Sequence, residues 1–385
     1  MPSSRRRPAT ASASRSASSA AAAAATATAT APINLALQGG GSHGAFTWGV
    51  LDRLLQDETL NIAAVSGTSA GALNAAVMAT GWAAGGRQGA RQALAAFWTD
   101  ISGEPTCFGP LGGAGGAPAA AAAALPWALP APALAFYNLD QNPFCAWFNG
   151  FTRLFSPQQF NPLGLDLLRQ AVQRHVDPQA MLHGPLALFV TATAVRTGQP
   201  RVFDNRENGD LNLDALLASA CLPQVFRPLM IEGEAYWDGG YSGNPSLWPL
   251  VYGTGSLDLL LVRINPLSRP AVPDTPDEIA DRVNEITFNA GLVSELRAIA
   301  FVQKLVDEGR VDPGHYKNLR LHMVADDASL APLHPSSKLN TAPDFLQRLH
   351  GLGLAAAERW WGAHRADVGR RSSLDIRREF LGQPH

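Results

Sequence analysis

Short apolar runs alternate with helical patterns over residues 33–80. The run Ile33–Leu37 is followed by glycines, which is typical of a buried strand that ends in a turn. Residues 45–55 then place apolar side chains at helical spacing: Phe46, Val50, Leu51, Leu54 and Leu55. A second run, Ile62–Val65, leads into an alanine-rich helix over about residues 70–80. This alternation predicts an α/β fold, with a central, mostly parallel sheet and helices on both faces.

The same patterning predicts regular structure further along the chain. Strands are expected at Leu186–Ala194, Arg201–Phe203 and Leu257–Ile264. The last of these contains LDLLLVRI, which is apolar on both alternations, as expected for a strand covered on both faces. One or two helices are expected over residues 277–308, and another over residues 344–363.

Two segments lack this patterning and set the expected domain boundaries. Residues 1–32 are rich in Ala, Ser, Thr and Arg, which predicts a disordered tail; a secretory signal is the competing interpretation. A low-complexity apolar insertion over about residues 105–139 has too many prolines for a continuous helix. It is either a loop before a small helical subdomain or a lid that touches lipid. We therefore expect a catalytic domain over residues 33–330 and a helical extension over residues 331–385.

Composition narrows the classes of function. The chain has 385 residues and a formal charge of −2, which gives no net-charge argument for binding nucleic acid. Its three cysteines form neither a close pair nor a zinc pattern, which suits a reducing compartment. No window is long and apolar enough for a transmembrane helix. These features predict a cytoplasmic protein that could touch a membrane surface, with secretion left open.

The first candidate site is the turn Gly39-Gly40-Gly41-Ser42-His43-Gly44. It matches the G-x-G-x-x-G pattern for a dinucleotide pyrophosphate, but the second strand is followed by Ser66 and not by the expected acid. What remains is a nest of backbone N–H groups beside a helix N-terminus, which stabilises negative charge. The turn could form an oxyanion hole, or it could bind phosphate in a regulatory protein.

The second candidate site, Gly67-Thr68-Ser69-Ala70-Gly71, is a G-x-S-x-G string between an apolar strand and a helix. That is where a nucleophile elbow lies, because small neighbours allow the sharp turn that exposes the serine hydroxyl. An ordinary strand–helix junction is the structural alternative.

The third candidate site, Asp238-Gly239-Gly240, supplies a carboxylate that could act as the base for Ser69. A histidine base is the alternative, as in a Ser-His-Asp α/β-hydrolase esterase. The downstream histidines are His315, His322, His334, His350 and His364, and none has a distinguishing context. His43 lies within the glycine turn, where a triad base is not expected.

These three sites, in this order, resemble the patatin-like phospholipase family. Residues 218–223, Phe226, Pro228 and Asn244-Pro245 also resemble the family's segments around its aspartate. The resemblance covers roughly residues 33–264 and implies a three-layer patatin-like fold. It implies a lipid acyl hydrolase with a Ser–Asp dyad, in which Ser69 is the nucleophile and Asp238 the proton acceptor.

The resemblance assigns the remaining positions as well. Backbone N–H groups of Gly39, Gly40 and Gly41 would form the oxyanion hole, and the other motif glycines are Gly44, Gly67, Gly71, Gly239 and Gly240. It implies a lipid or phospholipid substrate, transient membrane-surface contact and no cofactor or metal. The chain departs from the family at His43, where a basic Arg or Lys is frequent, so a preference for strongly anionic substrates is not implied.

Overall fold

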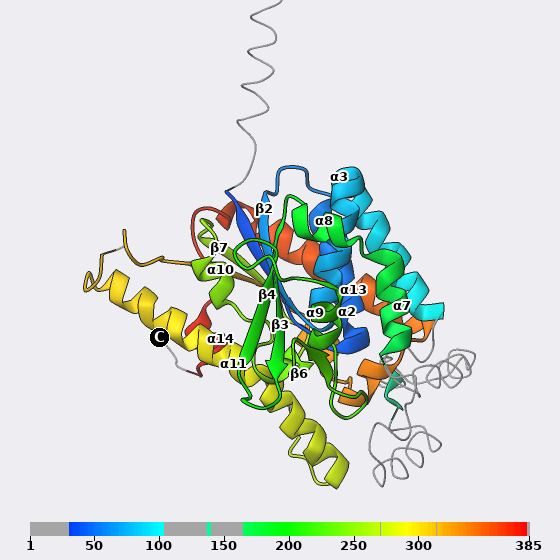
Figure 1. Cartoon of the computed structure of the whole chain (residues 1–385). Helices are drawn as coiled ribbons and strands as arrows, with labels where there is room; N and C mark the ends of the chain where they lie inside the picture. Colours follow the sequence, from blue (N-terminus) through cyan, green and yellow to red (C-terminus); the bar gives the residue numbers. More distant parts are fainter. Residues whose placement is uncertain (1–30, 104–136, 140–164, 270, 313, 383–385) are drawn as a thin grey trace, which may run out of the picture.

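The computed structural model describes residues 31–103, 137–139, 165–269, 271–312 and 314–382 (Figure 1). Its strands are β1 (Ile33–Leu37), β2 (Ile62–Thr68), β3 (Ala187–Ala194), β4 (Pro200–Asp204), β5 (Leu229–Ile231), β6 (Glu234–Asp238), β7 (Asp258–Val262) and β8 (Arg320–Val324). Its α-helices are α2 (Gly44–Leu55), α3 (Ala70–Gly103), α7 (Asp166–His175), α8 (Pro178–His183), α9 (Leu213–Ser219), α10 (Trp248–Tyr252), α11 (Pro276–Asp307), α12 (Asp327–Leu330), α13 (Pro343–His364) and α14 (Ile376–Phe380). Short 3₁₀ helices are η1 (Gly41–His43), η5 (Gly239–Tyr241), η6 (Pro335–Leu339) and η7 (Arg365–Asp367).

The strands of the described ranges form one mixed sheet in the order β5-β6-β3-β2-β1-β7-β8, with β4 also paired to β3. The pairs β3–β2, β2–β1, β1–β7 and β7–β8 are parallel. Strands β4 and β6 run antiparallel to β3, and β5 runs antiparallel to β6. The carboxyl ends of five parallel strands therefore share one edge, which is where open α/β sheets bind ligands.

Helices cover both faces of the sheet (Figure 1), which confirms the predicted fold class. On one face, Leu35 and Leu37 of β1 pack in a core with α2, α3 and α13. On the other face, Ala36 of β1 packs with apolar side chains of α10, α11 and α14. The strand side chains alternate between the two cores because successive residues of a strand point to opposite faces.

Several predicted elements have different bounds in the structure. Strand β2 runs on to Thr68, and α3 continues to Gly103 through a break at Gly85 and Gly86, which have non-helical backbone angles. Strands β5, β6 and β8 and helices α7, α8 and α9 were not among the predicted elements. The predicted tail and the predicted apolar insertion lie almost entirely outside the described residues.

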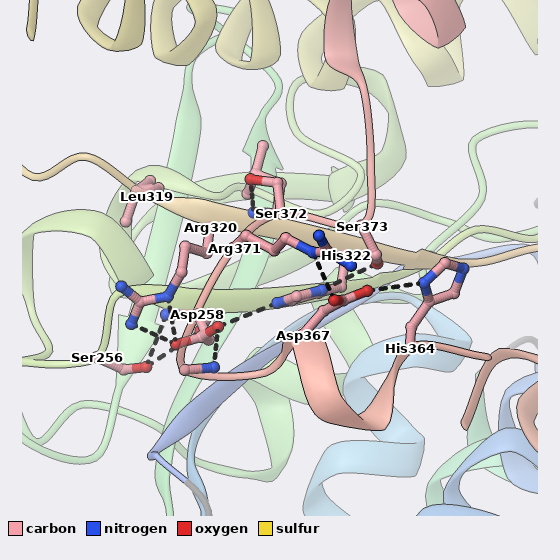
Figure 2. Close-up of polar contacts among 12 residues, drawn as sticks. Ser256, Asp258, Leu319, Arg320, His322, His364, Asp367, Arg371, Ser372 and Ser373 are labelled. Carbon is pink, nitrogen blue, oxygen red and sulfur yellow. Dashed lines mark hydrogen bonds and ion pairs between the residues drawn. The ribbon is translucent and has the colours of Figure 1, made fainter. Parts of the chain in front are cut away.

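The C-terminal segment is attached to the amino end of β7 and β8 by a buried polar network (Figure 2). Asp258 accepts hydrogen bonds from Arg320 at 2.6 and 3.0 Å and from the backbone N–H of Gly369 at 2.9 Å. His322 lies 3.0 Å from Asp258 through Nε2 and 2.9 Å from the Ser373 hydroxyl through Nδ1. The network lowers the pKa of Asp258 to about 2, against the effect of burial.

Replacing Asp258 by Asn should therefore destabilise the fold. The Asp258 side chain is fully buried, and asparagine carries no charge, so the substitution leaves Arg320 without its ion pair. Breaking a buried pair in this way costs about 3 kcal/mol or more of unfolding free energy, which urea denaturation at pH 7 would measure. The matched control is Asp312→Asn, because Asp312 pairs with His315 while both side chains are largely exposed. Equal destabilisation by the two variants would contradict a special role for the buried network.

Candidate active site

Ser69 lies at the sharp junction between β2 and α3, at the carboxyl edge of the sheet. Its φ is +54°, a left-handed backbone conformation that is uncommon for a residue with a side chain. The strand ends at Thr68 and the helix begins at Ala70, so a single residue makes the turn. This is the geometry of a nucleophile elbow, and it agrees with the G-x-S-x-G spacing.

The elbow is held from two sides. The backbone N–H of Ser69 donates to the Ser219 hydroxyl at 2.8 Å, and that hydroxyl donates to the Thr191 carbonyl at 2.6 Å. On the opposite side, Gly39 approaches so closely that a Cβ there would lie 2.6 Å from the Cβ of Ser69. Glycine is therefore required at position 39 for the glycine turn to lie against the elbow.

Asp238 reaches the same place from the antiparallel part of the sheet. It ends β6, where it pairs with Ala192 of β3, and β3 in turn pairs with β2. Its carbonyl accepts a hydrogen bond from the Thr193 hydroxyl at 2.8 Å. The next residue, Gly239, lies directly against the Thr191 carbonyl and leaves no room for a side chain. Residues about 170 positions apart in sequence are thus brought together across β3.

The carboxylate of Asp238 is fully buried, and only one of its two oxygens accepts a hydrogen bond from the described residues. Oδ1 accepts the backbone N–H of Gly240 at 2.7 Å, whereas Oδ2 accepts no hydrogen bond from the described residues. Burial raises the pKa of Asp238 to about 7, while Gly240, the Ser69 hydroxyl and the Lys338 ammonium lower it. The serine therefore interacts with the carboxylate, although the pair does not meet hydrogen-bond geometry in this conformation. Such pairs tighten when substrate binds.

The glycine turn follows β1 and differs from the expected oxyanion hole in one respect. The N–H of Gly39 donates to Asn244 Oδ1 at 2.6 Å, so it is already used. No residue of the described ranges accepts a hydrogen bond from the N–H groups of Gly40 and Gly41. The expectation of three donors is thus corrected to two candidates, Gly40 and Gly41. Asn244 could not have been assigned this role from sequence, since it lies 205 residues away.

His43 is buried in the turn and does not act on the candidate dyad. Its Nε2 lies 2.7 Å from the Ser337 hydroxyl, which itself donates to the His334 carbonyl. Burial lowers the pKa of His43 well below its usual value, and the positive charges of Lys338 and Arg269 lower it further. The imidazole is therefore neutral at physiological pH and supplies no cation to the turn.

Four of the five downstream histidines considered as a base lie beside carboxylates other than Asp238. The pairs are His315 with Asp312, His322 with Asp258, His350 with Asp52 and His364 with Asp367. None of the hydrogen bonds found within the described ranges joins a histidine to Ser69. The Asp258, His322 and Ser373 side chains form a chain of contacts of Ser-His-Asp type (Figure 2). Asp258 begins β7, however, whereas Ser69 follows the end of β2, so the two groups lie at opposite edges of the sheet.

Sequence reasoning missed the polar residues that support the turn. Gln38 Oε1 accepts the backbone N–H groups of Ile264 and Asn265 at 2.9 and 3.0 Å. Asn265 Nδ2 donates to the Gly39 carbonyl at 2.8 Å, and its Oδ1 accepts from Lys338 at 2.8 Å. The only signal in the sequence was the position of these residues, because Ile264 ends a predicted strand and Asn265 follows it, at the same edge of the sheet.

The remaining motif glycines lie at the same edge of the sheet. Gly44 begins α2, Gly67 packs against the backbone of Gly71 at the elbow, and Gly240 packs against the Phe288 ring. A hollow of about 410 Å³ elsewhere on the molecule, lined by residues of β4, β5 and β6 that include Arg201 and Tyr236, contains none of the site residues. Within the described ranges, no cluster of three or more His, Cys, Asp or Glu side chains is arranged to hold a metal ion.

Comparison with known proteins gives the family. The model of the patatin-like phospholipase family matches residues 35–251 of the chain, which include the elbow, the glycine turn and Asp238. The chain belongs to the patatin-like phospholipase family. Patatin-like phospholipases are lipid hydrolases, so the geometry of the site is to be compared with what hydrolysis of a lipid ester requires. Among curated proteins, the sequence finds no match.

Solved structures of two other bacterial proteins are also similar in part. VipD from Legionella pneumophila is 16% identical, with a TM-score of 0.43; the match covers 86% of this chain and 67% of VipD. The type III effector protein ExoU is 16% identical, with a TM-score of 0.27, and 54% of it is covered. ExoU of Pseudomonas aeruginosa in complex with SpcU is 15% identical, with a TM-score of 0.30 and 53% covered. Both of these matches cover 86% of this chain, which thus spans about half the length of ExoU.

None of the described helices of this patatin-like chain is long and apolar enough to cross a membrane.

Proposed function

We propose that this chain hydrolyses carboxylic esters of phospholipids or related lipids through a Ser69–Asp238 dyad and an acyl-enzyme. The observation that carries the proposal is that the candidate nucleophile and the candidate base lie together at one edge of the sheet. Ser69 has the backbone conformation of a nucleophile elbow, and the buried Oδ2 of Asp238 has no hydrogen-bond partner among the described residues. A base that is poised near pH 7 and a serine beside it match what nucleophilic catalysis requires.

The reaction follows from this arrangement. Asp238 accepts the proton of Ser69 as Oγ bonds to the acyl carbon, and the negative charge develops on the former carbonyl oxygen. The N–H groups of Gly40 and Gly41 stabilise that oxygen, and each good donor of this kind is worth about 3 kcal/mol. The C–O bond to the alcohol or lysolipid then breaks, and the leaving oxygen takes the proton from Asp238. Water attacks the acyl-enzyme with Asp238 again as base, which releases the fatty acid and restores Ser69.

A covalent probe tests the proposal directly. A fluorophosphonate should form one Oγ–P bond at Ser69 and release fluoride, and the same preparation should hydrolyse a short-chain ester and phospholipid vesicles in EDTA. Peptide mass spectrometry locates the adduct. Labelling at Ser373 would instead favour the Ser373-His322-Asp258 group of Figure 2 and overturn the dyad. An unlabelled and inactive protein, or one that needs calcium, would argue against the proposed mechanism.

A further inference from the structure

Lys338, of η6 in the C-terminal part of the chain, places an ammonium group beside the candidate active site. Its Nζ donates to Asn265 Oδ1 at 2.8 Å and lies 5.3 Å from the centre of the Phe288 ring. Its backbone carbonyl packs directly against Gly41. Position 338 lies outside the stretch matched by the family model, residues 35–251, so the family does not assign it a role.

The contacts of Lys338 place it between the two halves of the site. Asn265, which accepts its hydrogen bond, also donates to the Gly39 carbonyl and so adjoins the glycine turn. The Phe288 ring packs against Gly240, two residues after Asp238. The ammonium therefore lies beside both the candidate oxyanion donors and the candidate base, and its charge acts on Asp238 and on His43.

This ammonium has no anionic partner in the described part of the chain. Its one hydrogen bond goes to a neutral amide oxygen, and no carboxylate forms an ion pair with it. The nearby carboxylate of Glu285 is already shared by Arg269 and Arg282, which lies 3.1 Å from it. Burial lowers the pKa of Lys338 and the charge of Arg269 lowers it further, whereas the carboxylates of Glu285, Asp238 and Asp281 partly oppose this shift.

A cation in this position is expected to have an anion as a ligand. Charges withdrawn from water are normally paired, because an unpaired ion loses its hydration without compensation. Lys338 as a whole is partly exposed, while burial of its ammonium lowers its pKa, so an anion that enters the site would supply the missing partner. The free N–H groups and positive charge of Lys338 suit a phosphate oxygen, with which an ammonium makes a strong charge-assisted hydrogen bond.

We infer that Lys338 is a substrate-binding residue that holds the phosphodiester of a phospholipid while its ester carbonyl lies between Ser69 and the glycine turn. This inference rests on the proposed function and adds to it the residue that would bind the phosphate of the substrate. Phospholipids would be favoured over neutral glycerides, which carry no anion. The cation comes from η6, and the neutral His43 of the glycine turn takes no part in the contact.

The test compares two monomeric substrates, dihexanoylphosphatidylcholine and dihexanoylglycerol, below their aggregation limits. In Lys338→Gln, kcat/KM should fall about 10- to 100-fold more for the phospholipid than for the neutral glyceride. The variant and the wild type are compared at pH 9, where Asp238 is ionised in both proteins, because loss of the Lys338 charge also raises the pKa of Asp238. Glutamine keeps a donor for Asn265 Oδ1, so the turn stays supported while the charge is lost. Lys338→Arg should recover most of the phospholipid activity because it restores the charge. The control is Lys304→Gln, which removes the same charge from an exposed site on α11.

The outcomes separate this inference from the proposed function. A selective loss on the phospholipid, rescued by Arg, supports the inference. Equal losses on both substrates would overturn it and make Lys338 a support of the catalytic centre, and unchanged rates on both substrates would overturn it outright. If the Gln variant fails to fold by circular dichroism, glycerol 3-phosphate should still inhibit wild-type ester hydrolysis competitively, and absence of inhibition would overturn the inference. A wild type that is inert on both substrates would count against the proposed function instead.

Discussion

Replacing Ser69 by Ala should lower kcat for ester hydrolysis by about 10⁴-fold or more and leave the fold intact. The hydroxyl forms the acyl-enzyme in the proposed mechanism, so nothing in the site replaces it. Its loss costs little stability, because no residue in the described ranges forms a hydrogen bond with Ser69 Oγ. The left-handed backbone at this position is as unfavourable for alanine as for serine. Initial rates on a chromogenic short-chain ester, with circular dichroism to confirm folding, measure the effect.

A second buried serine of the site region provides the matched control. The Ser42 hydroxyl lies in the glycine turn, is fully buried and has no hydrogen-bond partner among the described residues. Ser42→Ala thus also removes a serine hydroxyl oxygen, but from the glycine turn and not from the elbow. It should keep turnover within about threefold of the wild-type rate, with equal or higher stability of the fold. Residual turnover in Ser69→Ala that approaches the wild-type rate would show that another group is the nucleophile.

The elbow and the fold class were predictable from sequence because their signals are local. An apolar strand, a turn of small residues and a helix occur within ten positions around Ser69. The parallel strands β1, β2, β3 and β7 were predictable because burial on both faces makes them largely apolar. The parallel strand β8 was not, because Arg320 and His322 interrupt its short apolar pattern. Strand β6 was not predicted, because it has only five residues and begins and ends with an acidic residue. The position of Asp238 in the sequence was therefore found from the D-G-G string, without the strand that places it.

The electrostatics of the site were beyond the sequence because they depend on distant contacts. Asn244 removes one of the three expected oxyanion donors by accepting the N–H of Gly39. From sequence, His43 was expected to give the turn less positive charge than an Arg or Lys would. In the structure its imidazole is neutral because burial lowers its pKa. The positive charge comes instead from Lys338, which is 294 or more residues from the turn and reaches it only through packing of η6 on η1.

The second prediction with a large effect concerns the base. In Asp238→Asn, kcat should fall by 10²- to 10⁴-fold, the usual contribution of a general base. Because burial raises the pKa of Asp238 to about 7, wild-type kcat/KM should rise with pH through about 7, as the carboxylate loses its proton and becomes able to accept that of Ser69. The Asn variant should lose this pH dependence together with its activity. A folded Asn variant that turns over normally would eliminate the dyad.

Stability should change in the opposite direction to activity. The folded-state pKa of Asp238 lies above the unfolded value of 3.8, so its contribution to stability is complete below pH 4 and is lost as pH rises through 7. The loss is on the order of 4 kcal/mol for a buried carboxyl with this shift. Asp238→Asn carries no charge at any pH, so above pH 7 it should be more stable than the wild type in urea denaturation.

Glu295 provides the control for this pH dependence. Burial raises the pKa of Glu295 to about 7 as well, but its carboxylate accepts the backbone N–H groups of Leu247 and Trp248 and is not part of the site. Glu295→Gln should therefore flatten part of the decline in stability between pH 4 and 7 and leave the pH profile of turnover unchanged. Only Asp238→Asn should alter both profiles, because only that carboxylate is both buried and beside Ser69. A Glu295→Gln variant with a shifted activity profile would show that the titration near pH 7 does not belong to Asp238.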